Sequence, residues 1–313
     1  MTTGRTPGYI TLCENGAIDD RIQSACDLLS ECTVCPRECR VNRFADERGF
    51  CRTGRKAEIS SYGPHFGEEP PLVGRHGSGT IFVTHCNLAC EFCQNAEISQ
   101  CGGSGNEVSS GTLADMMIRL QRQGCHNINI VTPTHIIPQL IHSVKIAAGQ
   151  GLCIPLVYNC GGYESVPVLR LLDGIVDMYM PDAKYGDNTV ALTLSHAPRY
   201  VDTAKAAITE MYRQVGNLVI ENGIAVRGLL IRHLVLPDNL AGSDVVLPWI
   251  AREISADCYV NIMAQYHPAG SMMGAGATPP YPALRRPITA QEYRSACRIA
   301  LESGLHHGFS LTG

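Results

Sequence analysis

Three cysteines with the spacing Cys-x3-Cys-x2-Cys form the most specific motif of the chain. They are Cys86, Cys90 and Cys93, and they follow a short apolar run at residues 80–84. Thiolates bind soft metals, and a structural zinc or a cubane iron–sulfur cluster usually takes four protein ligands. Three cysteines therefore leave one iron of such a cluster free to bind a small molecule.

A closed zinc or iron–sulfur site is the alternative interpretation of the same motif. Such a site would use a fourth protein ligand and leave no iron free. The candidates for that ligand are His85, Cys101 and Cys125.

A second group of cysteines lies nearer the N-terminus, at Cys32, Cys35, Cys39 and Cys51. A Cys-x2-Cys pair with two further cysteines close by is a strong signal for a metal site. Zinc and a second iron–sulfur cluster both fit, and free thiols or a regulatory disulfide are the alternatives. Residues 37–56 are rich in arginine, which we interpret as a face for a partner protein or as compensation for an anionic site, rather than as a nucleic-acid ribbon.

Composition limits the class of protein. The chain has 313 residues, of which 45% are hydrophobic and 15 are cysteine, and its formal net charge is −4. We expect one large domain with a small one, and no overall attraction to nucleic acid or acidic membranes. No apolar run approaches the ~18 residues that cross a membrane, and residues 1–9 lack the apolar core of a signal peptide. We therefore expect a cytoplasmic protein whose cysteines bind metal.

The elements that must position these cysteines alternate along the chain. Amphipathic segments at residues 112–123, 135–148, 166–172, 201–215, 244–253 and 290–303 are expected helices, with another one after Asp20. They separate apolar runs, which predict a parallel sheet buried on both faces, in an α/β fold that forms a partial (β/α)6 TIM-like barrel. Chemistry in such barrels lies at the carboxyl ends of the strands, where the cysteine loop falls. The expected strands are residues 80–84, 127–131, 154–158, 175–180, 228–234 and 259–264.

Two regions fall outside this alternation. Residues 57–78 are expected to be an irregular connector, and residues 265–287, rich in proline and glycine, are interpreted as a lid over the barrel mouth. We expect residues 1–75 to form an N-terminal extension with the four-cysteine metal module, and residues 76–313 to form the barrel domain.

These motifs resemble the radical S-adenosylmethionine (SAM) superfamily, and within it the PflX group of homologues of the pyruvate formate-lyase activating enzyme. The resemblance covers nearly the whole chain from Cys32. It implies a barrel of the radical SAM type, a [4Fe-4S] cluster on Cys86, Cys90 and Cys93, and SAM on the open iron. It rests on Cys32-Thr-Val-Cys35-Pro-Arg-Glu-Cys39, His65-Phe-Gly-Glu-Glu-Pro-Pro-Leu72, Gly77-Ser-Gly-Thr-Ile-Phe82 and Cys86-Asn-Leu-Ala-Cys90-Glu-Phe-Cys93-Gln-Asn95.

The resemblance also implies polar residues at the strand ends. Where the activating enzyme has Gly-Gly-Glu, this chain has Val131-Thr-Pro-Thr-His135 and lacks the carboxylate. The segment Met180-Pro-Asp-Ala-Lys184 resembles Leu-Asp-Leu-Lys of that enzyme. We predict catalytic roles for Asp182, Lys184 and His267, and cofactor-binding roles for Phe92, Thr132, Thr134, His135, Asn159, Arg232 and Tyr266.

The function that the resemblance predicts is reductive cleavage of SAM to a 5′-deoxyadenosyl radical, which abstracts hydrogen from a substrate that the sequence does not identify. Flavodoxin or ferredoxin would supply the electron. A protein or peptide is one class of substrate, and we expect neither a membrane nor a nucleic acid as partner. One alternative is activation of a glycyl-radical enzyme. Another is a non-catalytic metal-binding interaction protein built around residues 32–51.

Overall fold

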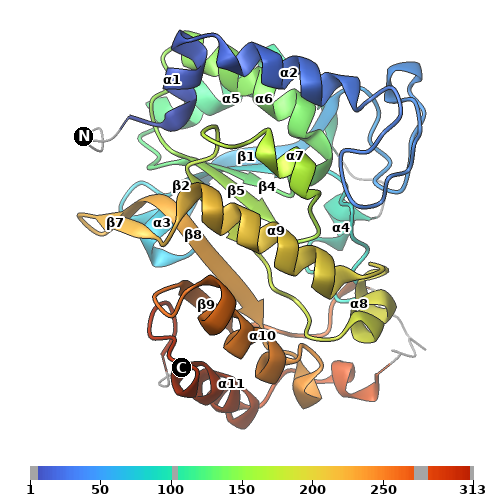
Figure 1. Cartoon of the computed structure of the whole chain (residues 1–313), viewed down its shortest axis with the longest axis vertical. Coiled ribbons are helices and arrows are strands. Elements are labelled where there is room, and N and C mark those ends of the chain that lie inside the picture. The colour runs from blue at the N-terminus through green and yellow to red at the C-terminus, as the bar shows by residue number, and fades with distance from the viewer. Residues whose placement is uncertain (1–5, 101–104, 271–280, 311–313) are drawn as a thin grey trace.

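The computed structural model describes residues 6–100, 105–270 and 281–310 (Figure 1). In these ranges nine strands form one sheet, in the order β3-β1-β2-β4-β5-β6-β8-β7, and β9 pairs with β8. Six of these strands are parallel to their neighbours in the series. The parallel strands are β2 (Ser78–Val83), β4 (Ile128–Val131), β5 (Leu156–Cys160), β6 (Met178–Pro181), β8 (Ile224–Leu234) and β9 (Tyr259–Met263).

The parallel strands confirm all six expected strands and the α/β fold class. Their order in space follows their order in the chain, as it does when each strand returns through a helix to the next position. Within the described residues β2 and β9 do not pair with each other, so the partial barrel is open. Its interior is filled by apolar side chains, among them Val157, Met178 and Leu230.

Three further strands extend the sheet in the antiparallel direction. β1 (Ala57–His65) pairs with β2, β3 (Asn106–Val108) pairs with β1, and β7 (Val219–Glu221) pairs with β8. The expectation of an irregular connector at residues 57–78 was wrong for β1 and for the short helix α3 (Pro70–Val73). β1 carries polar, half-exposed residues between its buried ones and so lacks an apolar run. The expected domain boundary after residue 75 stays a prediction.

The helices surround this sheet (Figure 1). Each expected helix is present, but α5 begins at Ser110 and not at Thr112, because the Ser109 hydroxyl accepts a hydrogen bond from the Thr112 N–H at 3.0 Å. The expected helix start at Thr289 is confirmed by a capping box with Glu292. The helices are α1 (Gly8–Glu14), α2 (Ala17–Asp27), α4 (Ala96–Ser99), α5 (Ser110–Arg122), α6 (Ile137–Gly149), α7 (Val166–Arg170), α8 (Asn188–Ser195), α9 (Tyr200–Val215), α10 (Ser243–Trp249) and α11 (Ala290–Glu302).

The N-terminal helices pack on the barrel's outer layer. α1 and α2 both contact α6, and Tyr9 and Ile18 are fully buried in the main hydrophobic core. Among the described residues, no helix combines the length and the apolar character that crossing a membrane requires.

One carboxyl group is buried beside β5. Glu164 is 2% exposed; its Oε1 accepts a hydrogen bond from the Thr134 hydroxyl at 2.6 Å, and its Oε2 accepts one from the Tyr158 hydroxyl at 2.8 Å. Burial raises the pKa of Glu164 to about 7, although the two hydroxyl donors favour the charged form. In the folded chain this group therefore holds a proton over a pH range where the unfolded chain releases it.

This shift makes the stability of the chain depend on pH. The unfolded carboxyl ionises near pH 4.5 and the folded one near pH 7, so the free energy of unfolding falls as pH rises through that window. Glu164→Gln removes the titration. We expect the stability of the variant relative to the wild type to rise by up to about 3 kcal/mol from pH 4.5 to pH 8, measured by anaerobic urea unfolding. The exposed Glu302→Gln is the control, and a flat difference for Glu164→Gln would contradict the prediction.

Candidate active site

The cysteine loop lies at the mouth of the barrel. β2 ends at Val83, and the loop that follows carries Cys86, Cys90 and Cys93 to one wall of a hollow of about 250 Å³. The opposite wall comes from the carboxyl ends of the other parallel strands, as expected for this fold. Its polar lining residues are Thr132, Asn159, Asp182, Lys184, Arg232 and, after β9, Gln265.

Each cysteine sulfur of the loop has a hydrogen-bonding neighbour. The Leu88 N–H donates to Cys86 Sγ at 3.3 Å, and the Ser195 hydroxyl donates to Cys90 Sγ at 2.9 Å. The Ser99 hydroxyl lies 3.3 Å from Cys93 Sγ. These contacts fix the side chains toward the hollow, and hydrogen bonds to sulfur tune the potential of an iron–sulfur cluster. Ser195 is remote from the motif in sequence and Ser99 follows it closely, but neither serine carries a signal of its own, so sequence reasoning missed both.

The closed-site alternative loses two of its three candidate ligands. His85 Nε2 lies 3.1 Å from Glu58 Oε2, and His85 does not line the hollow. Cys125 lies beside Gly79, near the start of β2 and hence at the other end of the strand. Cys101 lies outside the described residues. Within those residues no three His, Cys, Asp or Glu side chains are grouped around a position for one metal ion.

Three charged side chains form a network across the hollow from the cysteines. Lys184 Nζ donates to Asp182 Oδ2 at 2.6 Å, and Arg232 Nε donates to Asp182 Oδ1 at 2.8 Å. The other end of the guanidinium donates from Nη2 to Asn159 Oδ1 at 2.7 Å. The three charged side chains are only 15–17% exposed. Their strand-end positions, predicted from the sequence, bring them together in space.

These contacts keep the three groups charged. Burial alone would raise the pKa of the Asp182 carboxyl, but Arg232 and Lys184 outweigh it and hold that pKa below its usual value. Burial would lower the pKa of Lys184, but the Asp182 carboxylate outweighs it and the pKa is raised. Burial raises the pKa of the Cys90 thiol, and the nearby Lys184 ammonium opposes that rise. A cation therefore stands close to the cysteine sulfurs.

A second acidic side chain, Glu68, lies next to this network. The Glu68 side chain is 9% exposed, and its Oε2 lies 4.0 Å from Arg232 Nη1. Burial raises the pKa of Glu68, and Arg232 opposes that rise. A pair of acids in a connector usually lies at the surface, so the pattern of this segment does not indicate that Glu68 reaches a charged group of the barrel interior.

Thr132 holds a strained backbone at the rim of the hollow. Its φ is 61°, in the left-handed region that β-branched residues avoid, and its N–H donates to the Asn159 carbonyl at 2.8 Å. Such a conformation costs about 1–2 kcal/mol and tends to occur at ligand-binding sites. The resemblance expects a glycine-containing segment at this strand end, where the strain would vanish.

Four of the predicted site residues do not line this hollow. Thr134 is bonded to Glu164, and His135 Nε2 donates to the Thr84 carbonyl at 2.9 Å. Burial lowers the pKa of His135 to about 3, so its ring is neutral. Their roles as cofactor ligands stay predictions.

The other two follow β9. Tyr266 is buried; its ring packs edge-on against Phe92 with centroids 5.8 Å apart, and its hydroxyl donates to the Leu284 carbonyl at 2.8 Å. His267 is exposed, and its Nδ1 lies 3.2 Å from the Pro268 carbonyl. Phe92 itself lines the hollow, as does Gln265. The central part of the predicted lid, residues 271–280, lies outside the described residues.

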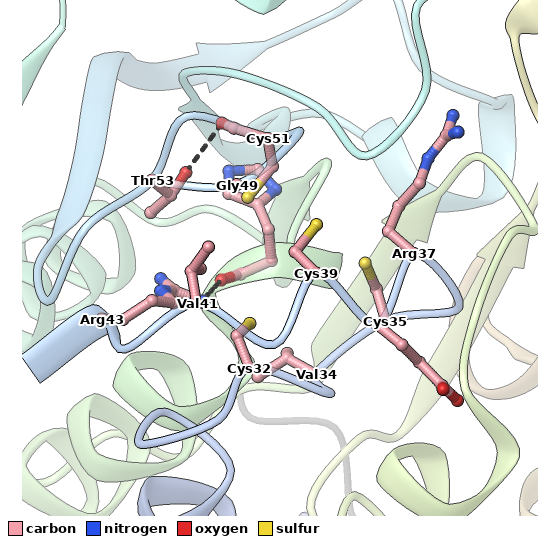
Figure 2. Close-up of a pocket in the computed structure, with 12 residues that line it drawn as sticks. Cys32, Val34, Cys35, Arg37, Cys39, Val41, Arg43, Gly49, Cys51 and Thr53 are labelled. Atoms are coloured by element: carbon pink, nitrogen blue, oxygen red, sulfur yellow. Dashed lines mark hydrogen bonds between the residues drawn. The ribbon is translucent and has the colours of Figure 1, made fainter. Parts of the chain in front are cut away.

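The N-terminal cysteines surround a separate, smaller hollow (Figure 2). Cys32, Cys35 and Cys51 are buried and Cys39 is half-buried. His135 lines this hollow rather than the one at the barrel mouth.

Comparisons with known proteins find solved structures with a similar fold and a relative with a similar sequence. No family model matches the chain. The crystal structure of a radical SAM methyltransferase from Sphaerobacter thermophilus superposes with a TM-score of 0.50 at 15% identity; the match covers 73% of this chain and 65% of that one. This chain thus spans just under two thirds of the methyltransferase, and the likeness shows a shared fold. The hydrogenase maturase HydG from Carboxydothermus hydrogenoformans gives a TM-score of 0.47 at 12% identity, over 72% of this chain and 51% of that one.

The relation in sequence extends further along the chain. The uncharacterized protein MJ0674 of Methanocaldococcus jannaschii is 31% identical over 291 residues, which are 90% of this chain and 78% of the relative. Because the match covers 90% of this chain, it includes most of the barrel. The partial barrel expected from the sequence is thus a fold that this chain shares with the methyltransferase structure, and the chain belongs to the same protein family as MJ0674.

Proposed function

We propose that this chain is a radical SAM enzyme whose reaction takes place in the hollow at the barrel mouth. The observation that carries the proposal is that the cysteine loop and the charged strand-end residues form opposite walls of one hollow. Three cysteines that share no described fourth ligand face a network of buried charges at the strand ends. Chemistry that needs an open metal position and a polar ligand would use both walls at once.

The residues present fit a [4Fe-4S] cluster. Cys86, Cys90 and Cys93 would hold it, with the hydrogen bonds from Leu88 and Ser195 directed at sulfur. When bound with SAM, such a cluster supplies the electron that divides SAM into methionine and a hydrogen-abstracting 5′-deoxyadenosyl radical. The protein's own part is binding, orientation and exclusion of water.

The charged network offers matching partners for the two ends of an amino acid. Lys184 and Arg232 carry positive charge toward the hollow, which suits a carboxylate. The Asp182 carboxylate and the Asn159 side-chain oxygen can accept hydrogen bonds from an ammonium group. SAM carries both groups on its methionine part. Phe92 and Leu88 give the same hollow an apolar side, which helps to exclude water.

The finer predictions from the sequence belong to this proposal. They are membership of the PflX group, a flavodoxin or ferredoxin as electron donor, and a cytoplasmic location. Activation of a glycyl-radical enzyme also stays a prediction.

Loss of one loop cysteine tests the enzyme directly. The wild type, reconstituted anaerobically with iron and sulfide, should release 5′-deoxyadenosine when SAM and dithionite are added. Cys90→Ala should lower that release by at least ~100-fold, because a cluster ligand is lost. Cys153→Ala, a cysteine of neither group, should match the wild type. Release measured by chromatography decides, and iron uptake by the wild type without SAM cleavage would support the non-catalytic alternative instead.

Neutralising the central acid tests the polar wall. Asp182→Asn keeps the shape of the side chain but removes the carboxylate that Lys184 and Arg232 share. We expect 5′-deoxyadenosine release to fall by about 10²-fold through misplacement of SAM, while the visible absorbance of the cluster is retained. The exposed Asp257→Asn is the matched control. Equal rates for the two variants would remove Asp182 from the proposed site.

A further inference from the structure

The four N-terminal cysteines converge although no helix or strand holds them together. Their sulfurs point into one hollow (Figure 2). The loop doubles back on itself, since the Cys32 N–H donates to the Val41 carbonyl at 2.9 Å and the Arg40 N–H donates to the Cys32 carbonyl at 3.0 Å. Cys32 and its neighbour Val34 belong to the main hydrophobic core. One side of the loop therefore packs on the main hydrophobic core, and its other side lines the hollow.

The backbone of this loop is shaped around the sulfurs. A Cβ added to Gly49 would lie 2.6 Å from Cys39 Cβ and 2.7 Å from its Sγ, so only glycine fits there. The next residue, Phe50, donates its N–H to Cys39 Sγ at 3.4 Å. The non-glycine residues Glu38, Arg40 and Arg52, which flank Cys39 and Cys51, have φ of 42°, 57° and 56°. Such strain persists where surrounding interactions over-determine the conformation.

Buried cations lie at the rim of the hollow. Arg43 lines it and is only 1% exposed; its Nε donates to the Gly54 carbonyl at 2.9 Å and its Nη1 to the His135 carbonyl at 2.8 Å. The Nη2 groups of Arg43 and Arg37 are buried without a hydrogen-bond partner in the described part of the chain. Buried donors are normally paired, so the Arg43 Nη2 group indicates an acceptor or an anionic group that protein atoms do not supply. The Arg37 guanidinium points away from the four sulfurs (Figure 2).

The four cysteines and the unpaired Arg43 donor favour an iron–sulfur cluster over a single zinc ion. Four thiolates around iron and sulfide make an anionic cluster whose sulfurs accept hydrogen bonds from N–H groups. A single zinc ion would draw four sulfurs to about 2.3 Å from one point. The four side chains surround one hollow from several sides (Figure 2). Only a cluster also brings sulfides, which would serve as acceptors for the unpaired Arg43 donor.

Arg37 links this hollow to the loop at the barrel mouth. It lines the four-cysteine hollow, and its Nε donates to the carbonyl of Asn87 at 2.9 Å, next to Cys86. Its guanidinium carbon lies 3.6 Å from the ring centroid of Phe50, which holds it in place. One positive charge is therefore shared between the two groups of cysteines.

We propose that Cys32, Cys35, Cys39 and Cys51 hold a second iron–sulfur cluster, and that Arg37 couples it electrostatically to the cysteine loop of the barrel mouth. The first part does not depend on the proposed reaction with SAM. The four-cysteine module is then a redox centre of the chain and not a structural zinc site.

The first experiment uses the full chain with Cys86, Cys90 and Cys93 all changed to Ala, reconstituted anaerobically. This variant should retain iron and sulfide in equal amounts, with broad visible absorbance that dithionite bleaches. Adding Cys35→Ala should remove most of that iron and absorbance, whereas adding Cys153→Ala should not. Circular dichroism shows whether each variant is folded. If the Cys35→Ala form is unfolded, X-ray absorption on the triple variant decides by the presence of iron–iron scattering.

Two outcomes would overturn the cluster. One is a single zinc per chain without visible absorbance, and the other is metal-free protein whose N-terminal cysteines are oxidised to disulfides. Because the triple variant cannot carry out the proposed reaction, a failure here is separate from a failure of SAM cleavage by the wild type.

The second experiment tests the coupling through Arg37. Removing its positive charge makes each cluster harder to reduce, so Arg37→Gln should shift the midpoint potential of the second cluster downward in the triple variant. In the wild-type background, Arg37→Gln should also lower the midpoint potential of the cluster on the barrel-mouth loop. Arg298→Gln, an exposed arginine on α11 and away from both groups of cysteines, is the control. The midpoint potentials are measured by redox titration monitored by electron paramagnetic resonance. Equal potentials for the two variants would show that Arg37 does not couple the sites.

Discussion

The mutual neutralisation of Asp182, Lys184 and Arg232 is the constraint on which the barrel mouth depends. Each of these charges is largely removed from water, and each is held charged by another member of the group. Removing one partner of a buried ion pair typically costs about 3–5 kcal/mol, because the charge that is left has no counter-charge. A chain that maintains such a network at a strand end, rather than an apolar core, gains a polar wall of fixed shape. That wall faces the cysteine sulfurs.

The parallel sheet explains how these residues meet. Asp182 and Arg232 are far apart in sequence, yet they pair across neighbouring strand ends. The cysteine loop leaves β2 at the same edge, and the serines that contact its sulfurs come from α4 and α8. The N-terminal loop then packs against this edge through Arg37 and Asn87. Two groups of cysteines that look independent in the sequence thus become neighbours in the fold.

Much of this could be predicted from the sequence, for identifiable reasons. The parallel strands are buried on both faces and therefore read as apolar runs, so all six were found. The cysteine spacing and the strand-end positions of Asp182 and Lys184 gave most of the barrel mouth. β1 was missed because polar, half-exposed residues interrupt its buried ones, so it has no apolar run. His135 and Tyr266 sit at expected positions but do not line the hollow. They hydrogen-bond to the carbonyls of Thr84 and Leu284, which are distant in sequence, and no local pattern predicts such contacts. Ser195 and Arg37 act through contacts that only the folded chain creates.

The proposed reaction requires SAM to bind the open iron of a cluster held by Cys86, Cys90 and Cys93. Electron–nuclear double resonance on the reduced protein detects that bond when SAM is labelled with nitrogen-15 in the amino group and oxygen-17 in the carboxylate. We expect hyperfine coupling of both labels to the cluster, lost in Cys90→Ala. Wild-type protein that binds labelled SAM in equilibrium dialysis but shows no coupling would contradict it.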